Sequence, residues 1–201
     1  MSSIQHNRQS RQPFDYTSAL TRVCEDICFR VPALNHIDMK RVAVCYSQTR
    51  HSAPVGTFAC VTPMRFCGGN LTKSTRNGEV TLHRYFSNSG EEYLYIIHFY
   101  IPRFIELSLS QKLETIVHEL YHISPSFDGD IRRFAGRCST HGHSQKKYDQ
   151  IVQGFVDHWL KQNPPPQIWD FLRLDYKTLT VTYGKLVGKK INFPKIIPVK
   201  K

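Results

Sequence analysis

Long apolar runs, a secretory leader and acidic residues are all scarce or missing in this chain of 201 residues. The most apolar window, YLYIIHFYI at 93–101, contains a histidine and is far shorter than the roughly 18 apolar residues of a membrane span. The first thirteen residues are polar and lack the apolar core of an export signal. We therefore expect no membrane insertion and predict a cytoplasmic protein.

The sequence also has no two cysteines at the spacing of a metal-binding pair. The six cysteines stand at positions 24, 28, 45, 60, 67 and 138, and none of them forms the C-x-x-C pair of a zinc knuckle. A chain of this length does not need disulfides to hold its fold, and without an export signal we expect free thiols. The sequence thus argues against a cysteine-based metal site.

Acidic residues are outnumbered, with 16 Asp and Glu against 27 Lys and Arg and a formal net charge of +11. Residues 185–201 hold six lysines and no acidic residue. Such a surplus concerns partners rather than fold, and it makes nucleic acid a candidate partner. The alternative is that the apolar residues among these lysines pack the segment on the domain, with the charges merely solvated.

Hydrophobic residues make up 40% of the chain and aromatic residues 12%, which is enough for one compact domain. We divide the chain into a flexible polar tail at 1–13, a domain at 14–163 and a basic C-terminal extension at 164–201. The extension begins with three prolines and is expected to contain a short helix and a small hairpin around Tyr183-Gly184.

Hydrophobic periodicity predicts an α+β domain. Helices are expected at 15–30 behind an Asp15 cap, at 108–124 with a Ser108–Gln111 capping box, and from Ser144 onward. A long loop at 124–143 separates the last two helices. Strands are expected at 41–47, 57–66, 79–86 and 92–101. The strands should form a small, mainly antiparallel sheet packed against the 108–124 helix and the flanking helices.

The segment HELYH at 118–122 contains the candidate metal ligands and the candidate general base. At about 100° per residue, His118 and His122 lie about 40° apart on one helix face, so their imidazoles can bind one tetrahedral metal ion. Glu119 lies about 100° round from His118, which suits a base acting on a metal-bound water better than a third ligand. The alternative is that both histidines are merely polar residues on a packing helix.

A catalytic zinc site needs three protein ligands and an open position for water. The 124–143 loop ends in His141-Gly142-His143, far enough from His122 for the chain to turn back over the metal. We prefer His141 as the third ligand because Gly142 allows the turn that aims it, whereas His143 is expected to cap the next helix beside Ser144. His143 remains the alternative, and one zinc ion per chain is expected.

Other residues near this motif have two interpretations each. Asp128 or Asp130 could accept the second N–H of a ligand histidine, although Asp128-Gly129 equally fits an ordinary turn. A loop arginine or Tyr148 could stabilise the oxyanion formed during amide hydrolysis, but a salt bridge or a packing role is the alternative for each.

The HELYH segment followed by a loop and His141-Gly142 resembles the minimal zincins of the SprT-like group. The longer string IPRFIELSLSQKLETIVHELYHISPSFDGDIRRFAGR…HGHSQKKYD is similar to a set of bacterial metallopeptidases, and the motif portion covers about residues 102–149. This resemblance implies a zincin-like α+β scaffold and a zinc protease that works near DNA. It also implies His118, His122 and His141 as zinc ligands and Glu119 as the catalytic residue.

These observations predict a zinc-dependent metallopeptidase acting on a protein or peptide substrate. The alternative is a non-catalytic, zinc-stabilised nucleic-acid-binding protein, which explains the basic surplus directly. Glu119 separates the two, because a closed structural zinc site has no use for a base. A metal-dependent hydrolase acting on other substrates would share every ligand.

Overall fold

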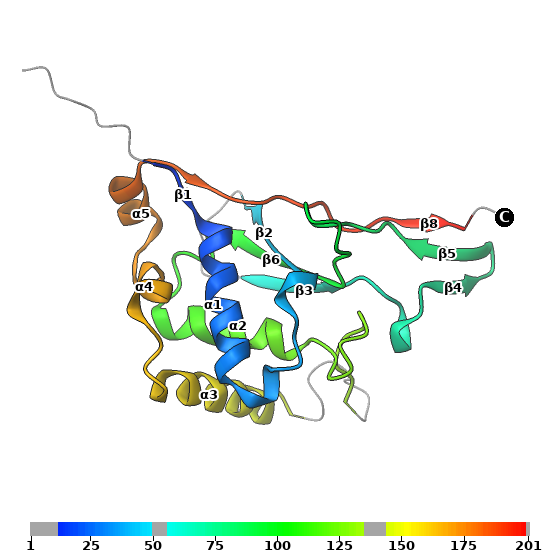
Figure 1. The fold of residues 1–201 in the computed structure, drawn as a ribbon, viewed down its shortest axis with the longest axis horizontal. Helices are drawn as coiled ribbons and strands as arrows, with labels where there is room; N and C mark the ends of the chain where they lie inside the picture. Colours follow the sequence, from blue (N-terminus) through cyan, green and yellow to red (C-terminus); the bar gives the residue numbers. More distant parts are fainter. Residues whose placement is uncertain (1–11, 50–55, 135–143, 200–201) are drawn as a thin grey trace, which may run out of the picture.

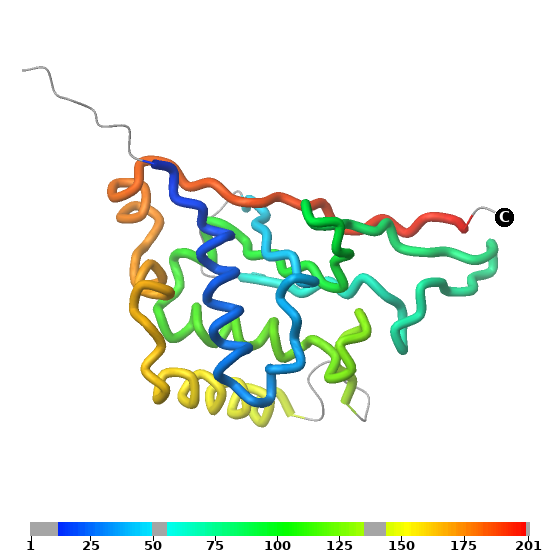
Figure 2. The backbone as a smooth tube through the Cα atoms, viewed as in Figure 1, coloured from blue at the N-terminus to red at the C-terminus, as the bar shows by residue number. Residues whose placement is uncertain are grey.

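The computed structural model describes residues 12–49, 56–134 and 144–199, and the structural statements below concern these residues (Figure 1). A central sheet lies between a layer of helices and the segment 185–199 near the C-terminus. Figure 2 shows that segment running along the length of the molecule to the far end of a second, protruding sheet. No helix in the described part of the chain is long and apolar enough to cross a membrane.

The three main helices begin where the sequence predicted, and the first two have the expected capping residues. The third was expected to be capped by His143, but its cap is Ser144. Asp15 accepts from Ser18 N at the start of α1 (Tyr16–Arg30). Ser108 and Gln111 form a capping box at the start of α2 (Leu109–Tyr121). Ser144 accepts from Lys147 N at the start of α3 (Gln145–Lys161). Each side-chain cap satisfies an N–H group that has no partner within the helix.

The central sheet has the strand order β2-β6-β3. Strand β2 (Val42–Gln48) runs parallel to β6 (Tyr95–Ile101), while β3 (Ala59–Pro63) runs antiparallel to β6 and forms an edge. One face of β6 packs Tyr95, Ile97 and Phe99 into the main core with the helices. The α+β class is therefore confirmed, but this sheet is mixed rather than mainly antiparallel.

The sequence predicted a single sheet, but the structure has two further small sheets beside the central one. β4 (Thr72–Thr75), β5 (Gly78–Leu82) and β8 (Ile196–Pro198) form an antiparallel sheet, and β1 (Phe14–Asp15) pairs in parallel with β7 (Leu186–Val187). The pairing of β8 with β5 joins residues more than 100 positions apart in sequence, which local patterns cannot predict. The β4–β5 hairpin protrudes from the helical layer (Figure 1).

The prediction of a hairpin around Tyr183-Gly184 is wrong. Residues Tyr176–Tyr183 form helix α5, whose Asp175 cap accepts from Thr178 N. Gly184, with φ of 77°, ends this helix in a conformation that favours glycine. Leu179 of α5 lies in the main core, so tertiary packing outweighs the strand preference of the β-branched residues around it.

The rest of the C-terminal segment is packed on the domain. Helix α4 (Pro166–Trp169) and the 3-10 turn Asp170–Arg173 contribute Trp169 and Leu172 to the main core. Farther along, Ile191 packs on the second face of the central sheet, where its carbonyl lies 2.8 Å from Nε2 of His98. Residues 164–199 are therefore bound to the domain through apolar side chains as well as strands.

Lys112 joins α2 to this C-terminal segment. Its side chain is only 2% exposed, and Nζ donates to the carbonyls of Leu172 at 2.7 Å and Leu174 at 2.9 Å. Burial lowers the pKa of Lys112 to about 8, although Glu106 and Asp175 favour its charged form. These bonds brace the N-terminal half of the helix that carries HELYH.

Candidate active site

The two histidines of HELYH converge at the C-terminal end of α2. His118 lies in the last turn, and His122 is the C-cap residue, with helical φ and ψ of −69° and −19°. Their Nε2 atoms are 2.9 Å apart. Two nitrogens bound to one tetrahedral zinc ion lie about 3.3 Å apart, given Zn–N bonds of about 2.0–2.1 Å. The pair thus fits two positions of a zinc site as far as donor type and spacing are concerned.

Glu119 lies beside this pair with its carboxylate buried. The residue is 7% exposed, and Oε2 accepts a hydrogen bond of 2.7 Å from Val61 N on β3. Burial raises the pKa of Glu119 to about 7, and the Val61 hydrogen bond opposes this rise. The carboxyl group is therefore held in place on one oxygen, in an environment that makes it a better proton acceptor.

The outer edge of β3 faces α2. Phe58 O accepts from Tyr100 N, and Met64 N donates to Leu94 O, so the even-numbered residues of this strand pair with β6. Because backbone groups alternate along an antiparallel strand, those of Ala59 and Val61 point away from the sheet, as the Val61–Glu119 bond shows. The catalytic candidates thus lie beside a strand edge that has backbone groups directed outward.

A cleft of about 290 Å³ lies next to His118 and Glu119. Its walls come from the start of β3 and from facing positions on α2 and α3. The lining residues are Phe58, Ala59, Leu107, Gln111, Glu114, Thr115, His118, Glu119, Asp149 and Val152.

Tyr148 holds the histidine pair in place. This residue of α3 is 2% exposed, and its ring stacks on His122 with centroids 5.4 Å apart. Its hydroxyl lies 3.3 Å from the His118 carbonyl and 3.3 Å from Nδ1 of His122. Donation to the carbonyl lets the hydroxyl accept from Nδ1–H, which leaves Nε2 of His122 with its lone pair for a metal.

The sequence did not reveal this positioning role for Tyr148. Its spacing with Val152 and Trp159 matches the core face of α3, and all three are indeed buried. A core position and a ligand-orienting position are compatible here, because the ring packs while the hydroxyl reaches the histidines. The available signal was a tyrosine in the first turn of the helix that follows His141-Gly142.

Replacing Tyr148 with phenylalanine should weaken zinc binding by about 10–100-fold, the usual effect of losing a group that orients a metal ligand. The ring contacts remain, so the fold should be retained. Zinc affinity can be measured by competition with a chromophoric chelator. Tyr121→Phe is the matched control, since Tyr121 packs against Tyr148 at 5.2 Å and its ring is likewise kept. An unchanged zinc affinity in Tyr148→Phe would show that the Tyr148 hydroxyl does not orient the zinc ligands.

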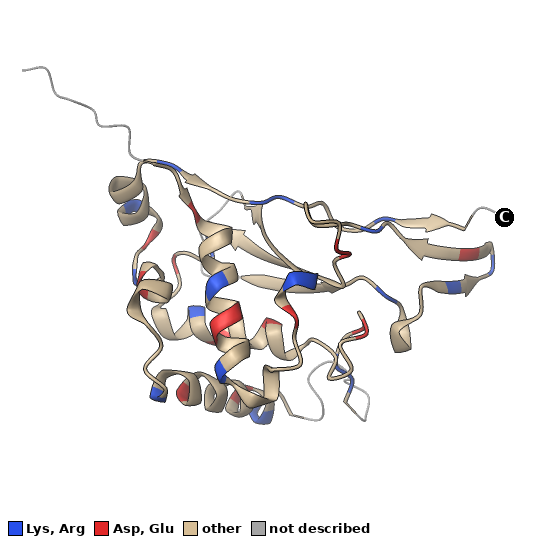
Figure 3. Ribbon diagram, in the orientation of Figure 1, with Lys and Arg blue, Asp and Glu red and all other residues tan. Residues whose placement is uncertain are grey.

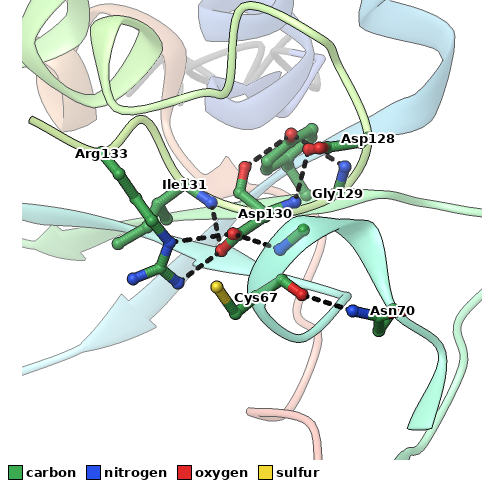
Figure 4. A network of polar contacts seen from close by, with 9 residues as sticks. Cys67, Asn70, Asp128, Gly129, Asp130, Ile131 and Arg133 are labelled. Atoms are coloured by element: carbon green, nitrogen blue, oxygen red, sulfur yellow. Dashed lines mark hydrogen bonds and ion pairs between the residues drawn. The ribbon is translucent and has the colours of Figure 1, made fainter.

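The loop after α2 is braced by Asp130, as Figure 4 shows. The Asp130 carboxylate accepts from Gly68 N, from Ile131 N and from the guanidinium of Arg133 at 2.8–3.0 Å. These donors lower its pKa, although partial burial acts in the opposite direction. The contacts support a loop-bracing role for Asp130 instead of the ligand-orienting role considered from the sequence.

Asp128 stabilises a turn, which is one of the two roles considered from the sequence. Its Oδ1 accepts from Asp130 N at 3.1 Å, and Gly129 has φ of 88°. Arg132 is also structural, because its Nε donates to the Tyr121 carbonyl at 2.7 Å while the guanidinium lies 4.2 Å from the centre of the Tyr121 ring. Arg132 N donates to the His122 carbonyl, so this arginine fixes the C-terminal end of α2.

The third ligand predicted from the sequence, His141, and its alternative, His143, lie outside the described residues. Within 12–49, 56–134 and 144–199, no group of three or more His, Cys, Asp or Glu side chains is arranged to hold a metal ion. Comparison with models of protein families, with curated proteins and with solved structures gave no match for this chain. The site must therefore be interpreted from its own residues.

Proposed function

We propose that this chain is a zinc-dependent metallopeptidase that hydrolyses peptide bonds. The observation that carries the proposal is the 2.9 Å approach of the His118 and His122 Nε2 atoms beside the buried carboxylate of Glu119. In this proposal the fold is zincin-like, as the resemblance to SprT-like zincins implies. His141 supplies the third zinc ligand, and one zinc ion binds per chain.

Zinc would supply Lewis-acid chemistry at this site, lowering the pKa of a water molecule and polarising the carbonyl of the scissile bond. Glu119 accepts a proton from the attacking water and delivers it to the leaving amine. Because Oε2 is engaged by Val61 N, we assign the proton transfer to Oε1. Tyr148 keeps His122 in the required orientation.

The edge of β3 suits a peptide substrate. The outward backbone groups of Ala59 and the carbonyl of Val61 can pair with an extended peptide in the manner of an added strand, while the N–H of Val61 stays bound to Glu119. Pro63 has no N–H group, so pairing of this kind ends toward that side of the strand. The partner that follows from the proposal is a protein or peptide with an extended, accessible segment.

The direct assay uses the full-length chain with zinc and an unfolded protein such as reduced and alkylated casein. We expect slow cleavage that stops when a zinc chelator is added and returns when zinc is restored. Cleavage that persists in the chelator would point to a contaminating or metal-independent protease. A complete lack of cleavage on unfolded substrates would contradict the proposed reaction.

The alternative, a zinc-stabilised nucleic-acid-binding protein, depends on the lysines spaced along residues 185–199 (Figure 3). Two of these lysines are already in contact with tyrosines: Lys189 Nζ donates to the Tyr93 hydroxyl at 2.9 Å, and Lys190 lies 4.9 Å from the centre of the Tyr46 ring. These contacts favour the interpretation in which the segment packs on the domain.

We therefore expect no DNA binding at micromolar protein in an anisotropy titration at low salt. Binding that falls steeply with salt, and that weakens in a Lys185→Gln, Lys195→Gln variant, would support the alternative, because lysines of this kind neutralise phosphates without reading bases. Truncation of the segment is unsuitable for this test, since Ile191 and the β7 and β8 pairings would be lost with the charges.

A further inference from the structure

Two carboxylates line the cleft beside the proposed catalytic residues, in a chain whose cations far outnumber its acids. Glu114 comes from α2 and is half-buried, and Asp149 comes from α3 and is exposed. Glu114 Oε1 accepts from Ser110 Oγ, and Asp149 Oδ1 accepts from Gln145 Nε2, both at 2.7 Å. Each of these bonds comes from the residue four positions earlier and brings no positive charge.

Neither carboxylate belongs to an ion pair within the described ranges. The ion pairs found there join arginines to Asp26, Glu92, Asp130 and Asp170. Most of the 16 acidic residues are likewise outside ion pairs within the described ranges, so what distinguishes these two is that both line one cleft, from facing helices. The cleft thus has a local negative charge on a strongly positive protein.

Apolar side chains form part of the other walls of the cleft, beside the polar Gln111 and Thr115. Phe58, Ala59, Leu107 and Val152 line it together with the two acids. A lysine or arginine side chain combines a long apolar stem with a charged end, so it matches apolar walls and carboxylates at once. The same cleft includes His118 and Glu119, which places any side chain bound in it next to the proposed site of bond cleavage.

We propose that this cleft receives a lysine or arginine side chain of the substrate, so that the enzyme cuts peptide bonds beside basic residues. Glu114 and Asp149 are the residues that determine this specificity, by pairing with the cationic end of the side chain. The inference rests on the proposed peptidase function. It adds a substrate class: unfolded or extended segments rich in lysine and arginine.

The test maps cleavage sites. Reduced and alkylated casein is digested with the zinc-loaded full-length chain, and the new ends are identified by mass spectrometry. Lysine and arginine should be enriched at one of the two positions that flank the cut. For a peptide built on such a site, kcat/KM should exceed that of its norleucine analogue by about fivefold, the upper range for one accessible ion pair.

Variants separate specificity from general damage. In Glu114→Gln combined with Asp149→Asn, the ratio of kcat/KM for the basic peptide to kcat/KM for its norleucine analogue should fall from about fivefold to about one. This ratio is measured within one variant, so a general loss of activity does not change it. Lysine at both positions should shift the preference toward acidic peptides, which a structural role would not produce. Asp157→Asn is the matched control: Asp157 also lies on α3 and accepts from a glutamine four residues earlier, Gln153, but does not line the cleft.

The two levels of the proposal can fail separately. Cleavage that requires Glu119 but shows no enrichment of basic residues would overturn this inference and leave the peptidase function standing. An enrichment that survives in the double variant would also overturn the role of Glu114 and Asp149. Absence of any zinc-dependent cleavage would overturn the peptidase function and the specificity together.

Discussion

Replacing Glu119 with glutamine should lower kcat by about 10²–10⁴-fold, the range that general acid–base catalysis contributes, while zinc remains bound. Glutamine keeps the shape of the side chain, and its Oε1 can still accept from Val61 N, so the contact between α2 and β3 is retained. What is lost is the ability to take a proton from water. The measurement is single-turnover or steady-state cleavage, paired with metal analysis of the same samples.

Glu25→Gln is the control for this substitution, since Glu25 is an exposed residue of helix α1 outside the active-site cleft. It should change neither turnover nor zinc content. Unaltered turnover in Glu119→Gln would transfer the role of base to another residue. Loss of zinc together with activity would instead show that Glu119 supports the metal site, as in a purely structural centre.

Replacing His122 with alanine should remove zinc altogether, because the two remaining ligands rarely hold a catalytic ion. The imidazole also stacks on Tyr148 and is 7% exposed, so a loss of stability of about 1–3 kcal/mol is expected from the cavity and the lost contacts. Zinc content after dialysis and thermal unfolding with and without zinc measure the two effects.

His158→Ala provides the comparison for a helix histidine outside the site. His158 lies near the end of α3 and is exposed, and its Nε2 accepts a hydrogen bond of 2.7 Å from Gln162 Nε2. This variant should keep one zinc ion per chain. Full zinc occupancy in His122→Ala would mean that the ion is held by other groups, and the assignment of HELYH as the metal site would be wrong.

The parts of the fold that could be predicted from the sequence are those set by local chemistry. Asp15, Ser108 and Ser144 start helices because their side chains satisfy nearby backbone N–H groups, an effect that needs only three or four residues. Strand locations followed from β-branched and aromatic residues in the same way. The starts of the three main helices and the approximate locations of the four expected strands were therefore accessible without long-range information.

The arrangement of strands could not be predicted, because pairing is decided by contacts between distant segments. Nothing local indicates that β2 pairs in parallel with β6, or that β8 at the C-terminal end completes a sheet with β5. Helix α5 shows the same limit: its β-branched sequence favours a strand, but burial of Leu179 and the Asp175 cap favour a helix.

The candidate site also combines local features, which the sequence predicts, with contacts between distant segments, which it does not. The helical period of 3.6 residues sufficed to bring His118 and His122 together, and the structure gives their Nε2 atoms a separation of 2.9 Å. The bond from Val61 to Glu119, the hydroxyl of Tyr148 and the carboxylates of Glu114 and Asp149 come from packing between separate elements. The role of His141 stays a prediction.

The central claim is most directly tested by the metal content of the wild-type chain. Protein purified without chelator from zinc-replete cells should contain one equivalent of zinc by mass spectrometry, and a variant lacking both His118 and His122 should contain none. Wild-type protein without zinc under these conditions, or equal zinc in the double variant, would contradict the assignment of HELYH as a zinc site.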